Sequence, residues 1–435
     1  MLKPADIMDN ERYVDIKEEN LENFSPKDFF KFADDPIDKK TAQFSKYFNH
    51  MLTEGFIMRE VRSPASKKVR IYERSSRKLI DVLMLGSNNY LDFANEPYII
   101  NKTIQAICEY GIGCGGPPLL NGTTSLHRRL EGRLAAMKGT EDAMVYSSGY
   151  AANVGWATGL LNEGDFLVYD WQSHASLHDS VKMGKFTGVR FLHNDMEDLD
   201  LQLTTVRRNS PKGNVVVCVE GVYSMDGDIA PLPEIKALCK KHRALLCIDD
   251  AHGTGVLGKN GHGTQEHYDM MGEVDIIMGT FSKSFGVTGG FIASSKKIID
   301  YLRFFSRSYM FSASLPPSVA SSVIAGMEFM DMHPERVQQL HENVEYFVNG
   351  LRKAGFSVVC HSAIIPLLVP EQYNVLKLVN MLHREGVFVN GVMYPAVPKD
   401  RQRLRISMMA TFTKEELDFA VSKILFVAKK IGWMK

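Results

Sequence analysis

A lysine in a small, polar and uncharged setting is the strongest candidate for chemistry in this sequence. Lys283 lies between Ser282 and Ser284, shortly after Thr280 and the apolar run Ile276–Met278. Most lysines are surface residues, and the chain has 51 lysines and arginines in all. A lysine just beyond a buried strand nevertheless suits an amine that forms a Schiff base, because desolvation lowers its pKa and makes it nucleophilic.

Acidic residues and a histidine follow a second apolar run. Asp249, Asp250 and His252 come directly after Ala244–Ile248. These residues are compatible with a solvated turn at a strand end, and also with a metal site, although no other Cys, His or Asp group stands at a supporting spacing. The functional interpretation is an acid at the end of a strand that faces a crevice.

Two further segments also follow apolar runs. Ser148, Gly149 and Tyr150 lie where a strand, a glycine turn and a helix are expected, and the free N–H groups of a helix N-terminus bind phosphate. Many α/β turns share that pattern. His174 follows Phe166–Tyr169, where a lone histidine is more often structural than catalytic.

An amine, an acid, a phosphate-binding turn and a histidine at the strand ends of one sheet together fit pyridoxal phosphate (PLP). The lysine holds the aldehyde, the acid keeps the ring nitrogen protonated so that the ring withdraws electrons, and the turn holds the phosphate.

Short apolar strands must position these residues. The runs are Val82–Leu85, Ala143–Tyr146, Phe166–Tyr169, Val215–Val219, Ala244–Ile248, Ile276–Met278 and Gly290–Ala293. Helical patterns fill many of the gaps, as in Pro231–His242. The alternation predicts an α/β fold with a parallel sheet buried on both faces, in which ligands bind beyond the carboxyl ends of the strands.

Changes in composition and apolar pattern along the chain predict three parts, which are residues 1–80, 81–330 and 331–435. The first is an N-terminal extension and arm, and the second is a large PLP-binding domain. The first 45 residues or so are rich in charge and contain a cluster of phenylalanines, which we expect to pack on the body or on a partner: Phe24, Phe29, Phe30 and Phe32.

The third part, residues 331–435, is predicted to form a smaller α+β domain. A helix is expected over Val337–Leu351, with Pro334 in its first turn and Gly355 at its end. A strand-like stretch, Phe356–Val369, follows, and a last helix starts at Thr413 with a Thr-x-x-Glu capping box.

Composition excludes several classes of function. Lys+Arg and Asp+Glu both number 51 in the 435 residues, so there is no basic surplus to neutralise a nucleic-acid backbone. The six cysteines form no C-x-x-C pair, which predicts free thiols in a reducing compartment. No apolar stretch approaches about 18 residues, and the acidic start has no apolar run, so we expect no transmembrane segment, no targeting peptide and a cytoplasmic location.

The sequence resembles the α-oxoamine synthases, a branch of the fold-type I, aspartate aminotransferase-like PLP enzymes. The motifs that carry the resemblance are Glu220–Gly227, Asp249–Gly255 and Gly279–Ser284. The resemblance runs from about Leu83 to the C-terminus and implies a large domain with a central, mostly parallel seven-stranded sheet, plus a smaller C-terminal α+β domain. Within the family, His193–Leu199 and Glu273–Gly279 are most similar to serine palmitoyltransferase. Ser224–Leu232 is also close to 8-amino-7-oxononanoate synthase, and Tyr394–Lys399 resembles glycine C-acetyltransferase.

The resemblance implies a role for each matching residue. Lys283 is the Schiff-base lysine, Asp249 the partner of the ring nitrogen, His252 the partner of the ring hydroxyl, and His174 the histidine stacked on the ring. The other cofactor-binding residues would be Ser148, Gly149, Tyr150, Ser224, Thr280, Ser282 and, from the second subunit of a homodimer with its site at the interface, Ser312 and Ser314. Asn89 and Arg405 match the substrate-binding residues, and the arginine takes the amino-acid carboxylate.

The implied reaction is a decarboxylative condensation of a small L-amino acid (serine, alanine or glycine) with an acyl thioester of coenzyme A or an acyl carrier protein. It gives an α-amino ketone, carbon dioxide and a free thiol. Pro117 and Pro118 stand where relatives commonly have an arginine, and Leu119 and Leu120 follow, which favours a fatty acyl chain. Relatives also often have a histidine within the segment that is Met409–Thr413 here.

Two alternatives remain open. One is another fold-type I enzyme such as an aminotransferase, which would accumulate pyridoxamine phosphate without a thioester. The other is a catalytically silent partner subunit, which would be expected to lack Lys283.

Overall fold

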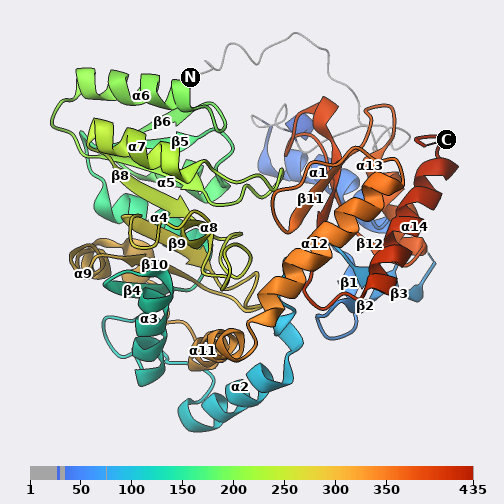
Figure 1. The fold of residues 1–435 in the computed structure, drawn as a ribbon, viewed down its shortest axis with the longest axis horizontal. Coiled ribbons are helices and arrows are strands. Elements are labelled where there is room, and N and C mark those ends of the chain that lie inside the picture. The colour runs from blue at the N-terminus through green and yellow to red at the C-terminus, as the bar shows by residue number, and fades with distance from the viewer. Residues whose placement is uncertain (1–26, 30–34, 75, 435) are drawn as a thin grey trace.

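The computed structural model describes residues 27–29, 35–74 and 76–434, and within these the strands form three sheets (Figure 1). The largest has seven strands, in the order β4 (Asp142–Tyr146), β10 (Gly290–Ser294), β9 (Ile276–Thr280), β8 (Leu245–Asp249), β7 (Val215–Glu220), β5 (Phe166–Asp170) and β6 (Thr187–Phe191). The strands from β9 to β6 run parallel, and β10 is antiparallel to both of its neighbours. The predicted mostly parallel seven-stranded sheet is therefore confirmed.

Both faces of this sheet are covered by helices, which explains the continuous apolar runs. Alternate residues of β7 enter different cores: Val216 and Cys218 pack on one face, and Val217 and Val219 on the other. The first face is covered by α4 (Gly149–Leu160), α5 (Ala175–Met183), α9 (Lys296–Phe305) and α10 (Arg307–Met310). The second is covered by α3 (Ser125–Lys138), α6 (Met196–Asn209) and α7 (Leu232–His242).

Six of the seven predicted runs are strands of this sheet, and the seventh is not. Val82–Leu85 overlaps β3 (Lys78–Met84), which belongs to a separate sheet with β1 (Glu60–Val61), β2 (Lys68–Glu73) and β12 (Val387–Phe388). The place in the large sheet is taken by β6, which the sequence analysis missed. As an edge strand, β6 has only one buried residue, Phe191, and so shows no apolar run.

The third sheet is formed by β11 (Ile364–Leu368), β14 (Arg403–Ser407) and β13 (Asn390–Val392). The predicted strand Phe356–Val369 is wrong in its first half. Within that stretch only Ile364–Leu368 pairs with β14, and the preceding residues, although Phe356 and Val358 are buried, have no neighbouring strand in the described chain.

The predicted C-terminal helices are present. α12 (Glu335–Lys353) covers the expected range, and Gly355, at φ +94°, follows its end. α14 (Lys414–Lys430) starts with the capping box between Thr413 and Glu416. Figure 1 shows α12, α13 (Val375–Arg384) and α14 around β11 and β12, away from α6 and α7. The remaining elements are α2 (Pro97–Tyr110), α8 (Thr264–His267), α11 (Pro317–Met332), η4 (Phe93–Asn95) and η5 (Lys399–Arg401).

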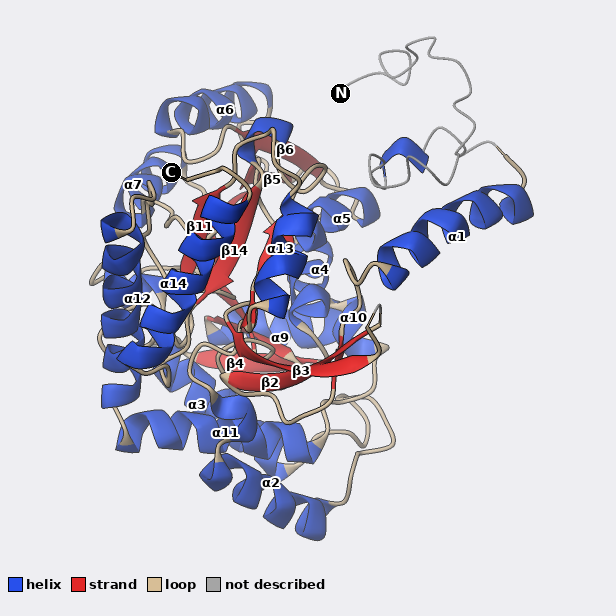
Figure 2. Ribbon diagram, turned by 90° about the vertical axis from the view of Figure 1, so that its right-hand side faces the viewer, coloured by secondary structure: helices blue, strands red, loops and turns tan. Residues whose placement is uncertain are grey.

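α1 (Ile37–Thr53) reaches out from the body at its N-terminal end, as Figure 2 shows. Its other end is anchored by Tyr47 and Met51, which form a small core with Phe56. The ring of Phe29 lies 5.1 Å from that of Tyr47, so this phenylalanine packs on the chain itself. Phe24, Phe30 and Phe32 lie outside the described residues.

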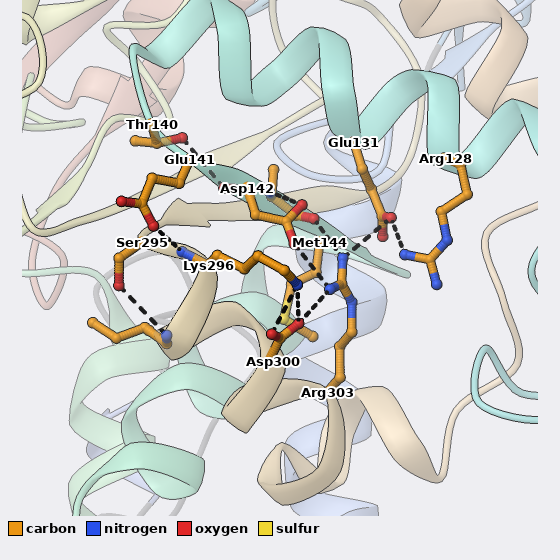
Figure 3. A network of polar contacts seen from close by, with 12 residues as sticks. Arg128, Glu131, Thr140, Glu141, Asp142, Met144, Ser295, Lys296, Asp300 and Arg303 are labelled. Atoms are coloured by element: carbon orange, nitrogen blue, oxygen red, sulfur yellow. Dashed lines mark hydrogen bonds and ion pairs between the residues drawn. The ribbon is translucent and has the colours of Figure 1, made fainter.

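A network of ion pairs fastens α3 and α9 to the edge strand β4 (Figure 3). Arg303 of α9 contacts Asp142 of β4 at 2.9 Å and Glu131 of α3 at 3.4 Å, and it also donates to the carbonyl of Ala143. The network therefore ties α3, α9 and the edge strand of the large sheet together.

The domain boundaries at residues 80 and 330 stay predictions. No helix of the described residues is both long and apolar enough to span a membrane.

Candidate active site

Lys283 lies in the tight connection between β9 and β10. Backbone hydrogen bonds from Phe281 to Gly289 and from Gly286 to Lys283 close this connection on itself. The Thr280 hydroxyl donates to the Gly289 carbonyl at 2.8 Å and lies 3.0 Å from the Ser282 hydroxyl. These bonds fix the lysine backbone at the carboxyl end of β9.

Burial lowers the pKa of Lys283 to about 8, although the nearby charge of Asp249 acts in the opposite direction. An amine with such a pKa is partly neutral near physiological pH, as a Schiff-base lysine requires.

Asp249 ends β8 and is buried. One of its oxygens accepts from the Asn153 amide of α4 at 2.7 Å, and the other accepts from the Ala251 N–H at 3.1 Å. Asn153 also donates to Ser176 and accepts from the indole of Trp156. The carboxylate is therefore held from the α4 side of the sheet.

Asp250 points to the other side. It pairs at 2.8 Å with Lys138, whose side chain is fully buried at the end of α3, and it also accepts from the hydroxyls of Thr254 and Thr264. Every acceptor position of Asp250 is thus engaged away from Lys283. Of the two adjacent carboxylates, only Asp249 lies on the same side as the α4 turn.

The two predicted histidines have different partners. His252 is buried, and its Nδ1 lies 2.8 Å from the hydroxyl of Tyr90. Burial, and next the charge of Lys283, lower the pKa of His252 well below its usual value, so the ring stays neutral. His174 caps α5, with Nδ1 2.8 Å from the Ser176 hydroxyl.

The predicted phosphate turn starts α4. Ser148 caps this helix by accepting from the Ala151 N–H. A Cβ placed on Gly149 would lie 3.0 Å from Thr280 Cβ, so a glycine relieves a tight contact where the helix start meets the lysine loop. The Tyr150 hydroxyl instead donates outward to Asp179.

Ser312 and Ser314, which the resemblance assigns to the second subunit, lie near two different segments of their own chain. The Ser312 hydroxyl is 3.5 Å from that of Ser147, beside the phosphate turn. The backbone N–H of Ser314 donates to the Gly116 carbonyl in the proline-containing loop. Their action across a dimer stays a prediction.

Arg405 on β14 is buried and faces the turn that follows β7. Its Nε donates to the Ser224 carbonyl at 2.6 Å, and Nη1 donates to Asn88 at 3.1 Å and to Ser407 at 3.0 Å. Ser224 therefore meets the arginine through its backbone.

Asn89 is oriented differently from its predicted role. Its amide donates to Asp92 and accepts from the N–H groups of Phe93 and Ala94, so it caps η4. Its neighbour Asn88 reaches Arg405 instead. Substrate binding by Asn89 stays a prediction, and Asn88 is the nearer candidate.

The sequence analysis gave no role to Glu220, which is buried and pairs in register with Asp249 across β7 and β8. Burial, and next the charge of Asp249, raise the pKa of Glu220 well above its usual value, and its Oε1 has no hydrogen-bond partner within the described part of the chain. A protonated carboxyl beside Asp249 and Lys283 can donate a hydrogen bond into the site. Its place at the end of an apolar strand was the available signal.

The donor set fits pyridoxal phosphate. A crowded glycine at the start of a twelve-residue helix, a lysine with a lowered pKa and a fixed carboxylate follow or end three strands of one sheet, β4, β9 and β8. No group of histidines, cysteines and acids suited to a metal ion occurs within the described chain.

Comparison with known proteins gives the same picture. Residues 80–424 match the family "aminotransferase class I and II". The chain is 42% identical over 366 residues to 8-amino-7-oxononanoate synthase of Geotalea daltonii, covering 83% of this chain and 93% of that one. It is 38% identical over 350 residues to serine palmitoyltransferase of Sphingobacterium spiritivorum, covering 80% and 87%.

Solved structures agree with the sequence relatives. A structure of SPT with a PLP internal aldimine superposes with a TM-score of 0.86 at 32% identity, covering 92% of this chain and all of that chain. Serine palmitoyltransferase of Sphingomonas wittichii superposes with a TM-score of 0.83 at 34% identity, with the same coverage.

Proposed function

The chain belongs to the aminotransferase class I and II family, and on that premise we propose that it is a PLP-dependent C-acyltransferase of the α-oxoamine synthase type. It condenses a small L-amino acid with an acyl thioester and releases carbon dioxide and the free thiol, leaving an α-amino ketone. The observation that carries the proposal is the convergence of Lys283, Asp249 and the Gly149 turn at the carboxyl ends of β9, β8 and β4, in a chain about 40% identical to two such synthases.

Each residue of the site has a definite task in this reaction. PLP, when bound, supplies the electron sink that stabilises a carbanion at the amino-acid α-carbon. Lys283 would hold the cofactor aldehyde, and its amine would be placed to accept the α-proton of the bound amino acid. Asp249, fixed by Asn153, would direct a negative charge at the ring nitrogen and keep it protonated. His252 and His174 hold the ring, and Arg405 takes the amino-acid carboxylate.

From the likeness to serine palmitoyltransferases we further propose that the amino acid is serine. We also propose that the acyl chain is long and apolar. The loop that would meet the acyl group contains Pro117 and Pro118, which offer neither a side-chain donor nor a charge. A carboxylate on the far end of an acyl chain would lose several kcal/mol if buried without a partner. An apolar chain gains about 0.8 kcal/mol for each methylene that it buries.

The same loop bears on the quaternary structure, for which we propose a homodimer. Ile112 and Leu120 are 83% and 81% exposed in the single chain, and Phe311, beside Ser312, is 71% exposed. Large apolar side chains gathered next to a site favour burial against another subunit. A second copy would cover the segments that flank Ser312 and the phosphate turn.

The test is a matrix of serine, alanine and glycine against palmitoyl, pimeloyl, succinyl and acetyl thioesters, with product mass and kcat/KM as readouts. Serine with palmitoyl thioester should give the highest kcat/KM. A preference for a carboxylated or acetyl thioester would contradict the chain assignment but leave the reaction type standing. Product formed from amino acid alone, as pyridoxamine phosphate, would show an aminotransferase instead.

A matched variant sharpens this test. Pro118→Arg places a guanidinium in the loop, where it can pair with a carboxylate on the acyl chain. The ratio of kcat/KM for succinyl over palmitoyl thioester should rise by about tenfold or more, the effect of one charge-assisted contact. Leu119→Met, at a neighbouring position, should leave the ratio unchanged.

A further inference from the structure

His193 lies between two carboxylates that come from different segments of the large sheet. Its Nδ1 is 3.0 Å from Asp170 and its Nε2 is 2.8 Å from Asp228. Asp170 ends β5, four residues before His174, and Asp228 closes the turn after β7. The imidazole thus bridges the segment that carries His174 to the turn that contacts Arg405.

The bridge is charged. Burial lowers the pKa of His193, but its hydrogen bonds to Asp170 and Asp228 outweigh that effect and raise the pKa to about 10. Both ring nitrogens therefore carry protons at neutral pH and donate to the carboxylates. Asn194 reinforces the bridge, since its backbone N–H donates to Asp170 and its side-chain amide to Asp228.

The turn held by Asp228 supports the amino-acid end of the site. It is closed by backbone bonds from Tyr223 to Asp228 and from Gly227 to Tyr223. The carbonyl of Ser224, within this turn, accepts from Arg405 Nε at 2.6 Å. A shift of the turn therefore moves an acceptor that orients the guanidinium.

The two carboxylates do not depend on His193 equally. Asp170 also accepts from the backbone N–H groups of Gln172 and Asn194, one on each oxygen. Among the residues that the structure describes, Asp228 Oδ2 accepts only from the Asn194 amide besides His193, and the buried Oδ1 has no partner. Loss of the imidazole should therefore loosen the turn more than the segment that carries His174.

On the proposed function, in which Arg405 takes the amino-acid carboxylate, we infer that His193 is a positioning residue that holds the turn from Tyr223 to Asp228, and through it Arg405, in the binding orientation. It does not touch the reacting atoms. Its removal acts on amino-acid affinity and leaves the cofactor in place.

The experiment measures the holoenzyme of His193→Gln. The dissociation constant for L-serine, read from the change in cofactor absorbance without any thioester, should rise about tenfold, as expected for the loss of one hydrogen bond between charged groups. PLP affinity should stay within about twofold, because Lys283, Asp249 and the phosphate turn are untouched. Hydrogen exchange of the amides in the turn should become faster.

Two controls separate positioning from general stability. His242→Gln removes a similar histidine–carboxylate pair, His242 with Asp200 at 2.6 Å, which joins α7 to α6 away from the turn, and it should leave serine affinity unchanged. In the double variant His193→Gln/Asp228→Asn, one of the two uncompensated charges is removed, and part of the lost serine affinity should return.

Unchanged serine affinity in His193→Gln would overturn the inference, and so would an equal loss of PLP and serine affinity. The first result would show that the turn does not need the bridge, and the second that His193 is merely structural. Because the readout is binding without thioester, a wild-type enzyme that binds serine but forms no condensation product would refute the proposed reaction without deciding the role of His193.

Discussion

Replacing Asp249 and Asp250 by asparagine, one at a time, should separate chemistry from stability. The two carboxylates are adjacent in the chain and both are buried. Asp249 accepts two hydrogen bonds, from Asn153 and Ala251. An asparagine there keeps one acceptor oxygen and turns its amide toward the other donor, which costs about 1 kcal/mol of folding free energy.

Asp250→Asn should cost considerably more. Asp250 Oδ2 accepts from Lys138 and Thr254, and Oδ1 accepts from the N–H and the hydroxyl of Thr264. An amide nitrogen on either side would meet two donors. Lys138, with a fully buried side chain, would also lose its counterion, which costs about 3–5 kcal/mol.

The effects on turnover should be reversed. Loss of the Asp249 charge removes the group that keeps the ring nitrogen protonated, and kcat/KM should fall about 10²-fold or more. Asp250 faces away from the site, so kcat/KM for each folded Asp250→Asn molecule should stay within about threefold of wild type, since no contact to the cofactor is removed.

The assay pairs steady-state kinetics on PLP-saturated enzyme with the midpoint of urea unfolding. Asp81→Asn, a change in an exposed ion pair with Arg70, is the control and should alter neither readout. Retained kcat/KM in Asp249→Asn together with a large loss in Asp250→Asn would refute the assignment of the two carboxylates.

The rate of PLP uptake by the cofactor-free protein, measured by absorbance, should increase as the pH rises through about 8. The reason is that burial lowers the pKa of Lys283 to about 8 and only the neutral amine attacks the aldehyde. A rate that stays constant across this pH range would contradict the lowered pKa. Lys283→Ala should eliminate turnover, and it should also eliminate the covalent PLP adduct that peptide mass detects after borohydride reduction. Lys296→Ala, at an exposed lysine, should keep both. Normal activity in Lys283→Ala would refute the whole mechanism. A truncation that starts at Ala42 removes Phe29 and the first turn of α1. Because Phe29 packs on Phe44 and Tyr47, the free energy of unfolding should fall by about 1–2 kcal/mol. An unchanged unfolding midpoint, with activity lost only toward carrier-bound thioester, would instead favour a role of this segment in binding the carrier.

Features set by neighbouring residues were predictable from the sequence. The capping box of α14 and the central strands of the large sheet follow from patterns within a few residues. β6 was missed because an edge strand is half exposed and needs no apolar run. Val82–Leu85 is a continuous apolar run like the central strands, yet it pairs with β2 and β12. No local pattern in the sequence shows to which of the two sheets such a run belongs.

Contacts between distant segments were not predictable in the same way. Lys138 and Asp250 are 112 residues apart, and Arg405 and Ser224 are 181 apart. Nothing near Lys138 marks it as buried, since it ends an ordinary helix. In the same way, either Asn88 or Asn89 could have reached Arg405, and only the fold assigns the contact to Asn88.

The choice between Asp249 and Asp250 follows from strand geometry once the helices are placed. Successive side chains of a strand point to opposite faces of the sheet. Cys247 packs in the core under α4, and Ile248 packs in the core on the α3 side. Continuing that alternation, Asp249 faces Asn153 of α4, and Asp250 faces Lys138 of α3. The helix that starts with the Gly149 turn covers the face of Asp249, so the acid and the predicted phosphate-binding turn meet on one side of the sheet. The position of a single helix thus decides which of two neighbouring carboxylates can serve the cofactor.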